Sequence, residues 1–472
     1  MLLQGSEGLG LVKPSEKISG RTTHGLFNSI GTFHFVGPDF LPVRENSFIF
    51  TLSVKKLINS YREVDKPVLQ MIAAEFWLQL INAAFFLILN IYLAKKGYSD
   101  AEIGKFVKYR FLAVMLLSLP LGIALKGKRM RPLFYISAIG VPLLSLLTIF
   151  AAERRMTELL NLSYLCWGFC FAFLQVGSLP YILRNCSREH QSKAIVLNFT
   201  VQSANAVIAG FIIFFLHRFH VSWLSDAHIL AGFALLGFVS IYHLLRIRVP
   251  EVVDRSEKPS GNIIIAINNY EWRLLLRAIL PTLLIAVGAG LTIPFINLFF
   301  YRVFGLDSDK FSLIGALAAV LVSFGNLLVP SIRTRHGYKV AITLSQSLAI
   351  VALSCLALTQ YFSQYRIALD AAIFFYLLRQ PLMNMAAPMT SELAMNYVGK
   401  RNREMLSAII AAIWSGSWYF SSELFILLIN LKLGYATIFL ITAALYVIGV
   451  VLYYLLIIDF EKRKKPDEVY DV

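Results

Sequence analysis

The sequence predicts an all-α, polytopic membrane protein with about twelve transmembrane helices. Of its 472 residues, 57% are hydrophobic and only 15% are charged, whereas an ordinary soluble domain carries roughly 25% charged residues. The apolar residues gather in long continuous runs, and most Lys and Arg residues fall between those runs. A soluble protein of this composition would expose large apolar patches to water, and a lipid bilayer removes that conflict.

The spans follow from the length of the apolar runs. A hydrophobic stretch of about twenty residues crosses a bilayer as a helix. The predicted spans are 68–94, 103–125, 133–151, 158–184, 195–216, 228–246, 274–301, 311–332, 339–360, 367–393, 405–431 and 434–458.

The positive charge is distributed unevenly among the predicted loops. The chain has 44 Lys and Arg against 28 Asp and Glu, a net charge of +16. The basic residues are concentrated in alternate loops, which is typical of cytoplasmic loops. We therefore expect both termini in the cytoplasm, a prokaryotic inner membrane as the location, and no nucleic-acid partner.

An internal repeat at an offset of 208 divides the chain. Gly97 after the first span matches Gly305 after the seventh, and Pro180 in the fourth matches Pro388 in the tenth. Repeats of this kind place two six-helix bundles around a shared site. The predicted parts are a cytoplasmic tail at 1–66, a bundle at 67–246, a cytoplasmic linker at 247–273, a second bundle at 274–458 and a cytoplasmic tail at 459–472.

Residues 1–66 differ from the rest of the chain. They are rich in Gly, Ser and Pro, contain no spanning run and lack the pattern of a signal peptide. The stretch 50–64 could form an amphipathic helix on the inner membrane surface. A loose tail and a natural start of translation after residue 45 both stay open.

The region 68–460 resembles the major facilitator superfamily. The resemblance rests on the segment 92–104 between the first two spans and on basic turns after the second and eighth spans. The family's turn motif reads roughly G-x-x-x-D-R-x-G-R-K. Its first copy here runs over 122–131 and its second ends at 335–339, with Lys126 and Thr334 in place of the acidic residue.

The resemblance implies two pseudo-symmetric bundles around a central cavity and transport by alternating access. It also implies a gating role for the residues that match the turn motif. These candidates are Gly122, Arg129, Arg335, Gly337 and Lys339. The fifth span has a single glycine, Gly210, and lacks the Gly-Pro signature typical of the family's drug–proton antiporters.

Three ionisable residues inside predicted spans are candidates for substrate binding or ion coupling. They are Glu75 in the first span, Arg379 in the tenth and Glu423 in the eleventh. A charge in lipid is costly and persists where a partner, water or a substrate stabilises it. We expect one carboxylate to bind a coupling proton and Arg379 to hold an anionic group. The alternative is a structural ion pair between the tenth and eleventh helices.

Polar uncharged residues in the spans should face the protein interior, because an amide in lipid needs hydrogen-bond partners. Gln175, Asn297 and Gln380 are the candidates for substrate contact. Interhelical hydrogen bonds are their alternative use. Arg110 is predicted to snorkel at the outer membrane edge, and the run from Trp414 to Trp418 to pack against a neighbouring helix.

These observations favour a secondary transporter of a small organic solute, with proton coupling as one option. A Walker loop, a His pair with zinc spacing and a Ser-His-Asp arrangement are all missing from the sequence. We therefore expect no enzyme activity, no cofactor and no metal, with a small molecule and the bilayer as partners of a monomer. A polytopic membrane enzyme and a sensor with a transporter fold are the alternatives.

Overall fold

A computed structural model describes residues 64–124, 128–187, 189–219, 224–251 and 271–467. Within these ranges the chain forms twelve helical segments of membrane-spanning length, as the sequence predicts. Ten of them are long and apolar enough to cross a bilayer by length and composition. The other two are α4 (Asp100–Ala124), which has five charged side chains between Asp100 and Arg110, and α14 (Arg366–Tyr397), which carries Arg379.

The first six segments precede the linker, and we call them the first half. They are α2 (Lys66–Ala84) with η1 (Phe85–Leu89) and α3 (Asn90–Lys95), α4, α5 (Arg131–Glu153), α6 (Thr157–Asn185), α7 (Gln191–Arg218), and α8 (Asp226–Gly237) with α9 (Val239–Leu245).

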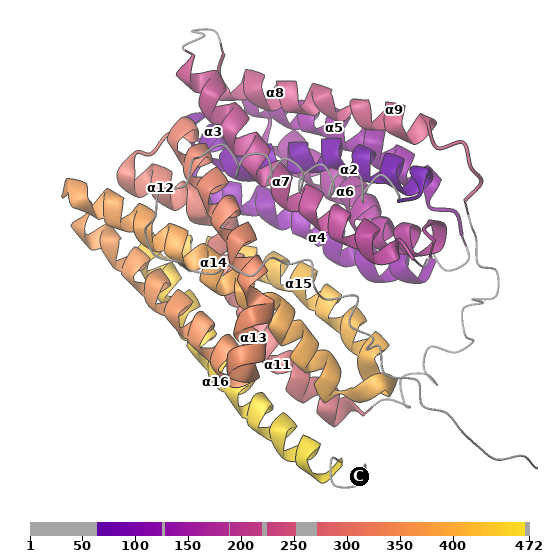
Figure 1. Cartoon of the computed structure of the whole chain (residues 1–472). Coiled ribbons are helices and arrows are strands. Elements are labelled where there is room, and N and C mark those ends of the chain that lie inside the picture. Colours follow the sequence, from indigo (N-terminus) through magenta and orange to yellow (C-terminus); the bar gives the residue numbers. More distant parts are fainter. Residues whose placement is uncertain (1–63, 125–127, 188, 220–223, 252–270, 468–472) are drawn as a thin grey trace, which may run out of the picture. The chain divides into compact units, whose positions relative to one another are not determined.

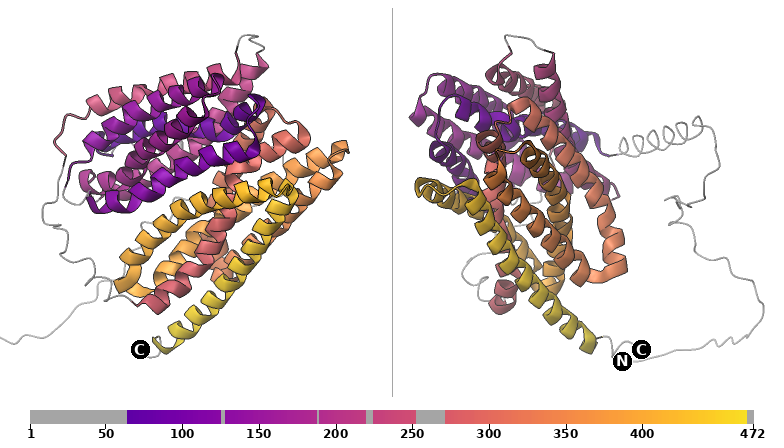
Figure 2. Two further views of the ribbon diagram at one scale, coloured as in Figure 1. Left: turned by 180° about the vertical axis from the view of Figure 1, so that it is seen from behind. Right: turned by 90° about the vertical axis from the view of Figure 1, so that its left-hand side faces the viewer.

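The last six segments form the second half (Figure 1). They are α11 (Trp272–Thr292) with η2 (Ile293–Phe295) and α12 (Ile296–Phe304), the two helices merged in α13 (Ser308–Leu358), α14, α15 (Gly399–Asn430) and α16 (Tyr435–Asp467). Gly337 divides α13, because its φ of 67° and ψ of 178° are not helical. Helices of each half lie beside one another in all three views (Figure 2).

The repeat seen in the sequence has a structural counterpart. The first and seventh segments leave regular α-helix at Phe85 and Ile293, which differ by the repeat offset. Pro294 explains the second break, because proline cannot donate to the helical ladder. Gly97 and Gly305 adopt left-handed φ values of +85° and +65° at the ends of these segments, a conformation that favours glycine.

The two halves contact each other along α4 with α15 and along α7 with α13. A Cβ atom on Gly104 would lie 2.8 Å from Ile426 Cγ1, and one on Gly210 would lie 2.5 Å from the carbonyl oxygen of Ser312. The Phe111 and Trp418 rings also meet, with centroids 4.8 Å apart. Small residues let these helix backbones approach closely, as in other membrane helix pairs.

The predicted tail and the amphipathic stretch at 50–64 lie outside the described residues up to residue 63. Most of the predicted linker, at 252–270, lies outside them as well. At the described start of the linker, the Glu251 carboxylate accepts hydrogen bonds from the backbone N–H groups of Met130 and Arg131, at 2.8–3.2 Å. This carboxylate caps the N-terminus of α5, where the helix dipole favours a negative charge. The exact bounds of the five predicted parts stay a prediction.

Candidate functional site

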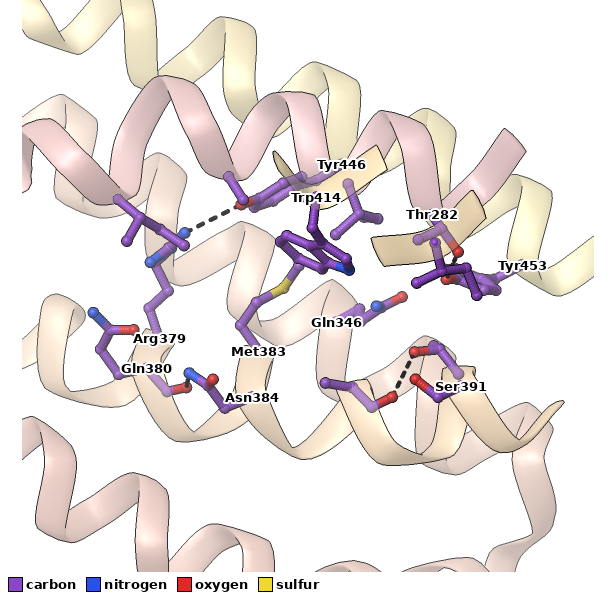
Figure 3. A pocket seen from close by; sticks show the side chains of 16 residues that line it. Thr282, Gln346, Arg379, Gln380, Met383, Asn384, Ser391, Trp414, Tyr446 and Tyr453 are labelled. Atoms are coloured by element: carbon purple, nitrogen blue, oxygen red, sulfur yellow. Dashed lines mark hydrogen bonds between the residues drawn. The ribbon is translucent and has the colours of Figure 1, made fainter. Parts of the chain in front are cut away.

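Arg379 lies in the middle of α14 and is almost fully buried, with 1% of its surface exposed. Its Nη2 atom donates to the Tyr446 hydroxyl over 3.4 Å, and its buried Nε atom has no hydrogen-bond partner among the described residues. Figure 3 shows the side chain at one end of a cavity within the second half, with Thr282 and Tyr453 at the other end.

Several polar side chains line this cavity among apolar ones. Its volume is about 140 Å³. Thr282 and Tyr453 are joined by a hydrogen bond of 2.8 Å, and the Oε1 atom of buried Gln346 has no partner among the described residues. The other side chains that line it include Ile285, Ile293, Gln380, Met383, Asn384, Ser391, Ile410 and Trp414.

Arg379 is the single charged side chain among the described residues that line the cavity. An uncompensated charge inside a membrane costs at least a few kcal/mol. A tyrosine hydroxyl is a weak partner for a guanidinium, because it carries no negative charge. The site thus combines a buried cation that has an unpartnered donor with a cavity beside it.

Glu75 is fully buried in α2, and its carboxylate accepts hydrogen bonds from neutral side chains. Ser178 Oγ donates to Oε2 at 2.6 Å, while Gln202 Nε2 and Gln79 Nε2 donate to Oε1 at 3.0 and 3.3 Å. No salt bridge to Glu75 is found within the described part of the chain. Neutral donors alone hold this carboxylate, which makes it a suitable group for reversible protonation.

A second cavity lies between the halves, and Arg110 lines it together with Asn82 and Gln175. The prediction that Arg110 snorkels at the outer membrane edge is therefore wrong. Its guanidinium stacks 4.3 Å from the Trp167 ring centroid, its Nη2 donates to Asn82 Oδ1, and its Nε has no partner among the described residues. A cation–π contact and a half-buried amide stabilise the charge here instead of water at the membrane surface.

Trp414 lines both cavities, so the sites around Arg379 and Arg110 share one wall. Trp418 also lines the cavity between the halves, in addition to its contact with Phe111. The predicted packing role of this run is thus only part of what it does. The sequence gives no sign of a shared wall, because helical spacing does not show which groove a tryptophan enters.

The other candidates occupy different places. Gln175 and Gln380 line the cavities of Arg110 and Arg379, respectively. Glu423 forms an ion pair of 2.7 Å with Lys108 of α4, so it joins the two halves and is not the partner of Arg379 in this structure. No ion pair between Arg379 and Glu423, the structural alternative for the tenth and eleventh helices, is found in the described part of the chain.

Asn297 is a buried residue at the contact between α12 and the first half. Its Nδ2 atom donates to the carbonyl oxygens of Phe86 and Leu87, both at 3.2 Å, and Asn90 Nδ2 donates to the Pro294 carbonyl at 2.7 Å. Each amide thus binds the backbone of the opposite half where that helix is irregular. These contacts support the interhelical use of Asn297.

Comparison with known proteins identifies the family. The model of the Major Facilitator Superfamily matches residues 71–422, well over half of the chain. The chain belongs to the Major Facilitator Superfamily. No curated protein matches it closely enough to be counted as a relative.

Solved structures give the same fold for this facilitator-superfamily protein. A point mutant of the nucleoside transporter NupG matches with a TM-score of 0.64 and 16% identity, over 83% of this chain and 99% of that one. An inward-facing, occupied bacterial homologue of the lysosomal transporter Spinster matches at 0.62 and 14%, over 82% and 96%. A D-xylose–proton symporter matches at 0.61 and 14%, over 86% and 97%. At these identities the likeness shows the fold alone.

Family membership and fold together make the chain a secondary transporter. The family is one of transporters, so the membrane-enzyme alternative is set aside. The substrate is a separate question, because one fold serves many solutes.

The gating candidates lie away from both cavities of this facilitator-superfamily transporter. Gly122 lies near the end of α4, and Arg129 and Arg335 are exposed. Lys339 is exposed and its Nζ lies 5.0 Å from the Tyr454 ring centroid, next to the non-helical Gly337. Their gating role stays a prediction.

A set of ion pairs that sequence reasoning missed joins the halves at the end that carries Gly97 and Gly305. Lys95 Nζ lies 3.1 Å from Asp307 Oδ1, and Arg302 Nε lies 2.8 Å from Asp100 Oδ1. The two basic residues, like the two acidic ones, lie 207 positions apart, one less than the repeat offset, as Asn90 and Asn297 do. The sequence did contain a signal for these pairs. A basic residue lies near the end of the first and of the seventh helix, and an acidic residue follows the next turn in both cases.

Proposed function

We propose that this transporter carries a small organic anion, that the anion binds Arg379, and that transport is coupled to protons through Glu75. The observation that supports this substrate class is the burial of Arg379 in a cavity without an acidic partner among the described residues. A carboxylate or phosphate would supply the missing charge and accept the unused donors of the guanidinium. The amides and hydroxyls of the cavity would orient the rest of the solute.

Proton coupling is supported by the environment of Glu75. A buried carboxylate held by neutral donors can take up a proton with little rearrangement of charge around it. Glu75 lies in the first half and Arg379 in the second, so a proton and an anion would bind different halves of the protein. Rocking of the halves would then carry both.

The contacts between the halves support a direction for the open side. Two ion pairs and one helix contact join the halves toward the end that bears Gly97 and Gly305. They are Lys95 with Asp307, Arg302 with Asp100, and the contact between α7 and α13. With both termini in the cytoplasm, that end faces outward and the cavities open inward. The gating residues of the turn motif would then make their contacts when the cytoplasmic side closes. These residues are Gly122, Arg129, Arg335, Gly337 and Lys339.

The direct test is uptake by proteoliposomes that contain the purified full-length protein. The panel comprises monocarboxylates, dicarboxylates, organic phosphates and neutral analogues of the same shapes, each with and without a pH gradient. We expect uptake of at least one anion, no uptake of its neutral analogue, and faster uptake into vesicles from a more acidic outside. Liposomes without protein are the control.

Two outcomes would contradict the proposal. Uptake of neutral solutes or cations with no anion transported would remove the role of Arg379. Saturable anion binding without flux would favour the sensor alternative.

A further inference from the structure

A continuous chain of hydrogen bonds connects Arg110 to Glu75. Arg110 Nη2 donates to Asn82 Oδ1, Asn82 Nδ2 donates to Gln79 Oε1 at 3.2 Å, and Gln79 Nε2 donates to Glu75 Oε1 at 3.3 Å. The two amides stand on one face of α2, because they are three residues apart and Gln79 is four from Glu75. The chain runs from the cavity between the halves to the buried carboxylate.

The direction of every bond in this chain is set by Arg110. A guanidinium only donates, so Asn82 must present its oxygen to Arg110 and its nitrogen to Gln79. Gln79 must then present its nitrogen to Glu75, which suits an ionised carboxylate. A protonated Glu75 that donated along the same line would need the oxygen of Gln79, and both amides would have to reverse. Reversal would turn the Asn82 nitrogen toward Arg110, and two donors would face each other.

We propose that Arg110 is a second anion-binding residue of the transporter and that Asn82 and Gln79 couple its occupancy to protonation of Glu75. An anion that draws Nη2 away from Asn82 frees the amides to reverse, and Glu75 can then keep a proton taken from water. By linkage, protonation of Glu75 favours anion binding to the same extent. Anion and proton therefore bind together, which is the thermodynamic basis of symport.

The apolar part of the cavity lining supports an organic anion with an apolar body. Phe86, Phe111, Val114 and Trp418 line it beside Arg110. The guanidinium face is occupied by Trp167, so the edge with its N–H groups is what remains for a ligand.

Other groups near Glu75 are neutral. Its described partners are Ser178, Gln202, Gln79 and Asn198. Most titratable side chains of the helices packed against α2 lie toward the ends of those helices. Those in the middle of α6 lie at positions other than Ser178, the residue of α6 that contacts Glu75. The titratable side chains of these helices are Arg131, Tyr135 and Glu153 of α5; Glu158, Tyr164, Cys166, Cys170, Tyr181 and Arg184 of α6; Lys193, His217 and Arg218 of α7; Asp226 and His228 of α8; and Tyr242 and His243 of α9.

Ser178 offers a competing route for the Glu75 proton. Its Oγ atom also lies 2.8 Å from the Leu174 carbonyl, so the hydroxyl could donate there and accept from a protonated Glu75. In that case the state of Arg110 would not affect Glu75.

The test is a double-mutant cycle on the full-length protein without any solute. Infrared difference spectroscopy during a pH titration follows the carboxylic acid band of Glu75, which Glu75→Gln removes and thereby identifies. We expect Arg110→Gln to raise the midpoint of Glu75 protonation by about one pH unit, the value of one hydrogen bond. In an Asn82→Leu background the same change should move the midpoint by less than about a third of a unit.

The cycle separates the relay from the charge of Arg110 acting through space. A through-space effect would persist undiminished in the Asn82→Leu background and would overturn the proposal. An unchanged midpoint in Arg110→Gln would do the same and would favour Ser178 as the acceptor. A Glu75 band that does not titrate between about pH 4 and about pH 9 would also count against it.

Matched variants keep the result interpretable. Asn205→Leu removes a buried amide of α7 that does not belong to the hydrogen-bond chain from Arg110 to Glu75. This variant should keep the wild-type midpoint of Glu75 protonation. If Arg110→Gln does not fold, Arg110→Met serves, because methionine is also unbranched and removes the donor that fixes the orientation of Asn82. The proposal rests on the proposed function for the identity of the anion. Because the cycle uses no solute, a failed uptake screen and a failed cycle remain distinct results.

Discussion

At the scale of single residues, Arg379 has no ion pair to maintain in the described structure. Its hydrogen-bond partner is the neutral Tyr446, while Glu423 is paired with Lys108. Arg379→Ala should therefore leave the folded yield unchanged, since it orphans no carboxylate. Arg379→Lys should insert normally and lose at least about tenfold in anion uptake, because lysine keeps the charge but cannot donate in a planar pair.

Uptake per milligram of purified protein in proteoliposomes measures this effect. Arg366→Lys is the matched control, because Arg366 lies on the same helix, is exposed, and lines neither cavity. A well-folded Arg379→Lys protein with full uptake would contradict the binding role. A collapse of the folded yield in Arg379→Ala would point to a structural role.

At the scale of helices, the contact between α7 and α13 depends on Gly210. An added Cβ there would meet the Ser312 carbonyl oxygen at 2.5 Å and the Ala316 Cβ at 2.7 Å, and a backbone atom cannot move aside cheaply. We expect Gly210→Ala to lower stability by about 1–3 kcal/mol through overpacking. Gly232→Ala is the control, because nothing lies within 4 Å of its added Cβ and alanine favours the helix. Thermal unfolding in detergent measures both, and equal melting temperatures would show that this contact adapts.

At the scale of the whole transporter, the exchanged ion pairs Lys95–Asp307 and Arg302–Asp100 hold one end of the halves together. Breaking a pair with Arg302→Asp should favour a state open at that end. Adding Asp100→Arg should restore the closed preference, because the pair is then re-formed with its charges reversed. The two partly exposed pairs are each worth at most about 1 kcal/mol, so the expected shift is a few-fold.

A cysteine in place of Ser415, in the wall of the central cavity, reports this equilibrium. The native Cys166, Cys170, Cys186 and Cys355 are replaced first. A membrane-impermeant maleimide should label Ser415→Cys from the cytoplasmic side, and Arg302→Asp should increase labelling from the other side. If Ser415→Cys is labelled mainly from outside while both ion pairs are intact, the proposed orientation is contradicted. A charge reversal that does not restore the wild-type pattern would contradict the role of the pair.

Local sequence predicted the twelve helical segments and their approximate positions. Hydrophobicity over about twenty residues is a property of neighbouring residues, and lipid imposes it wherever a helix crosses. The repeat was visible for a related reason, since Gly97 and Gly305 are needed for left-handed turns and Pro294 for a helix break. Glu75 and Arg379 stood out because a charge inside a span is rare. Their burial and the cavity beside Arg379 came from the structure.

Only the tertiary structure decided which groups meet. Arg110 was assigned to the membrane edge because it lies early in its span, but the facing of α4 turns it toward Trp167 and Asn82. Glu423 pairs with Lys108 across the halves. Partners of this kind depend on how each helix is rotated about its axis and on which half it faces. Those two quantities are set by the packing of many side chains at once, so no single span contains them.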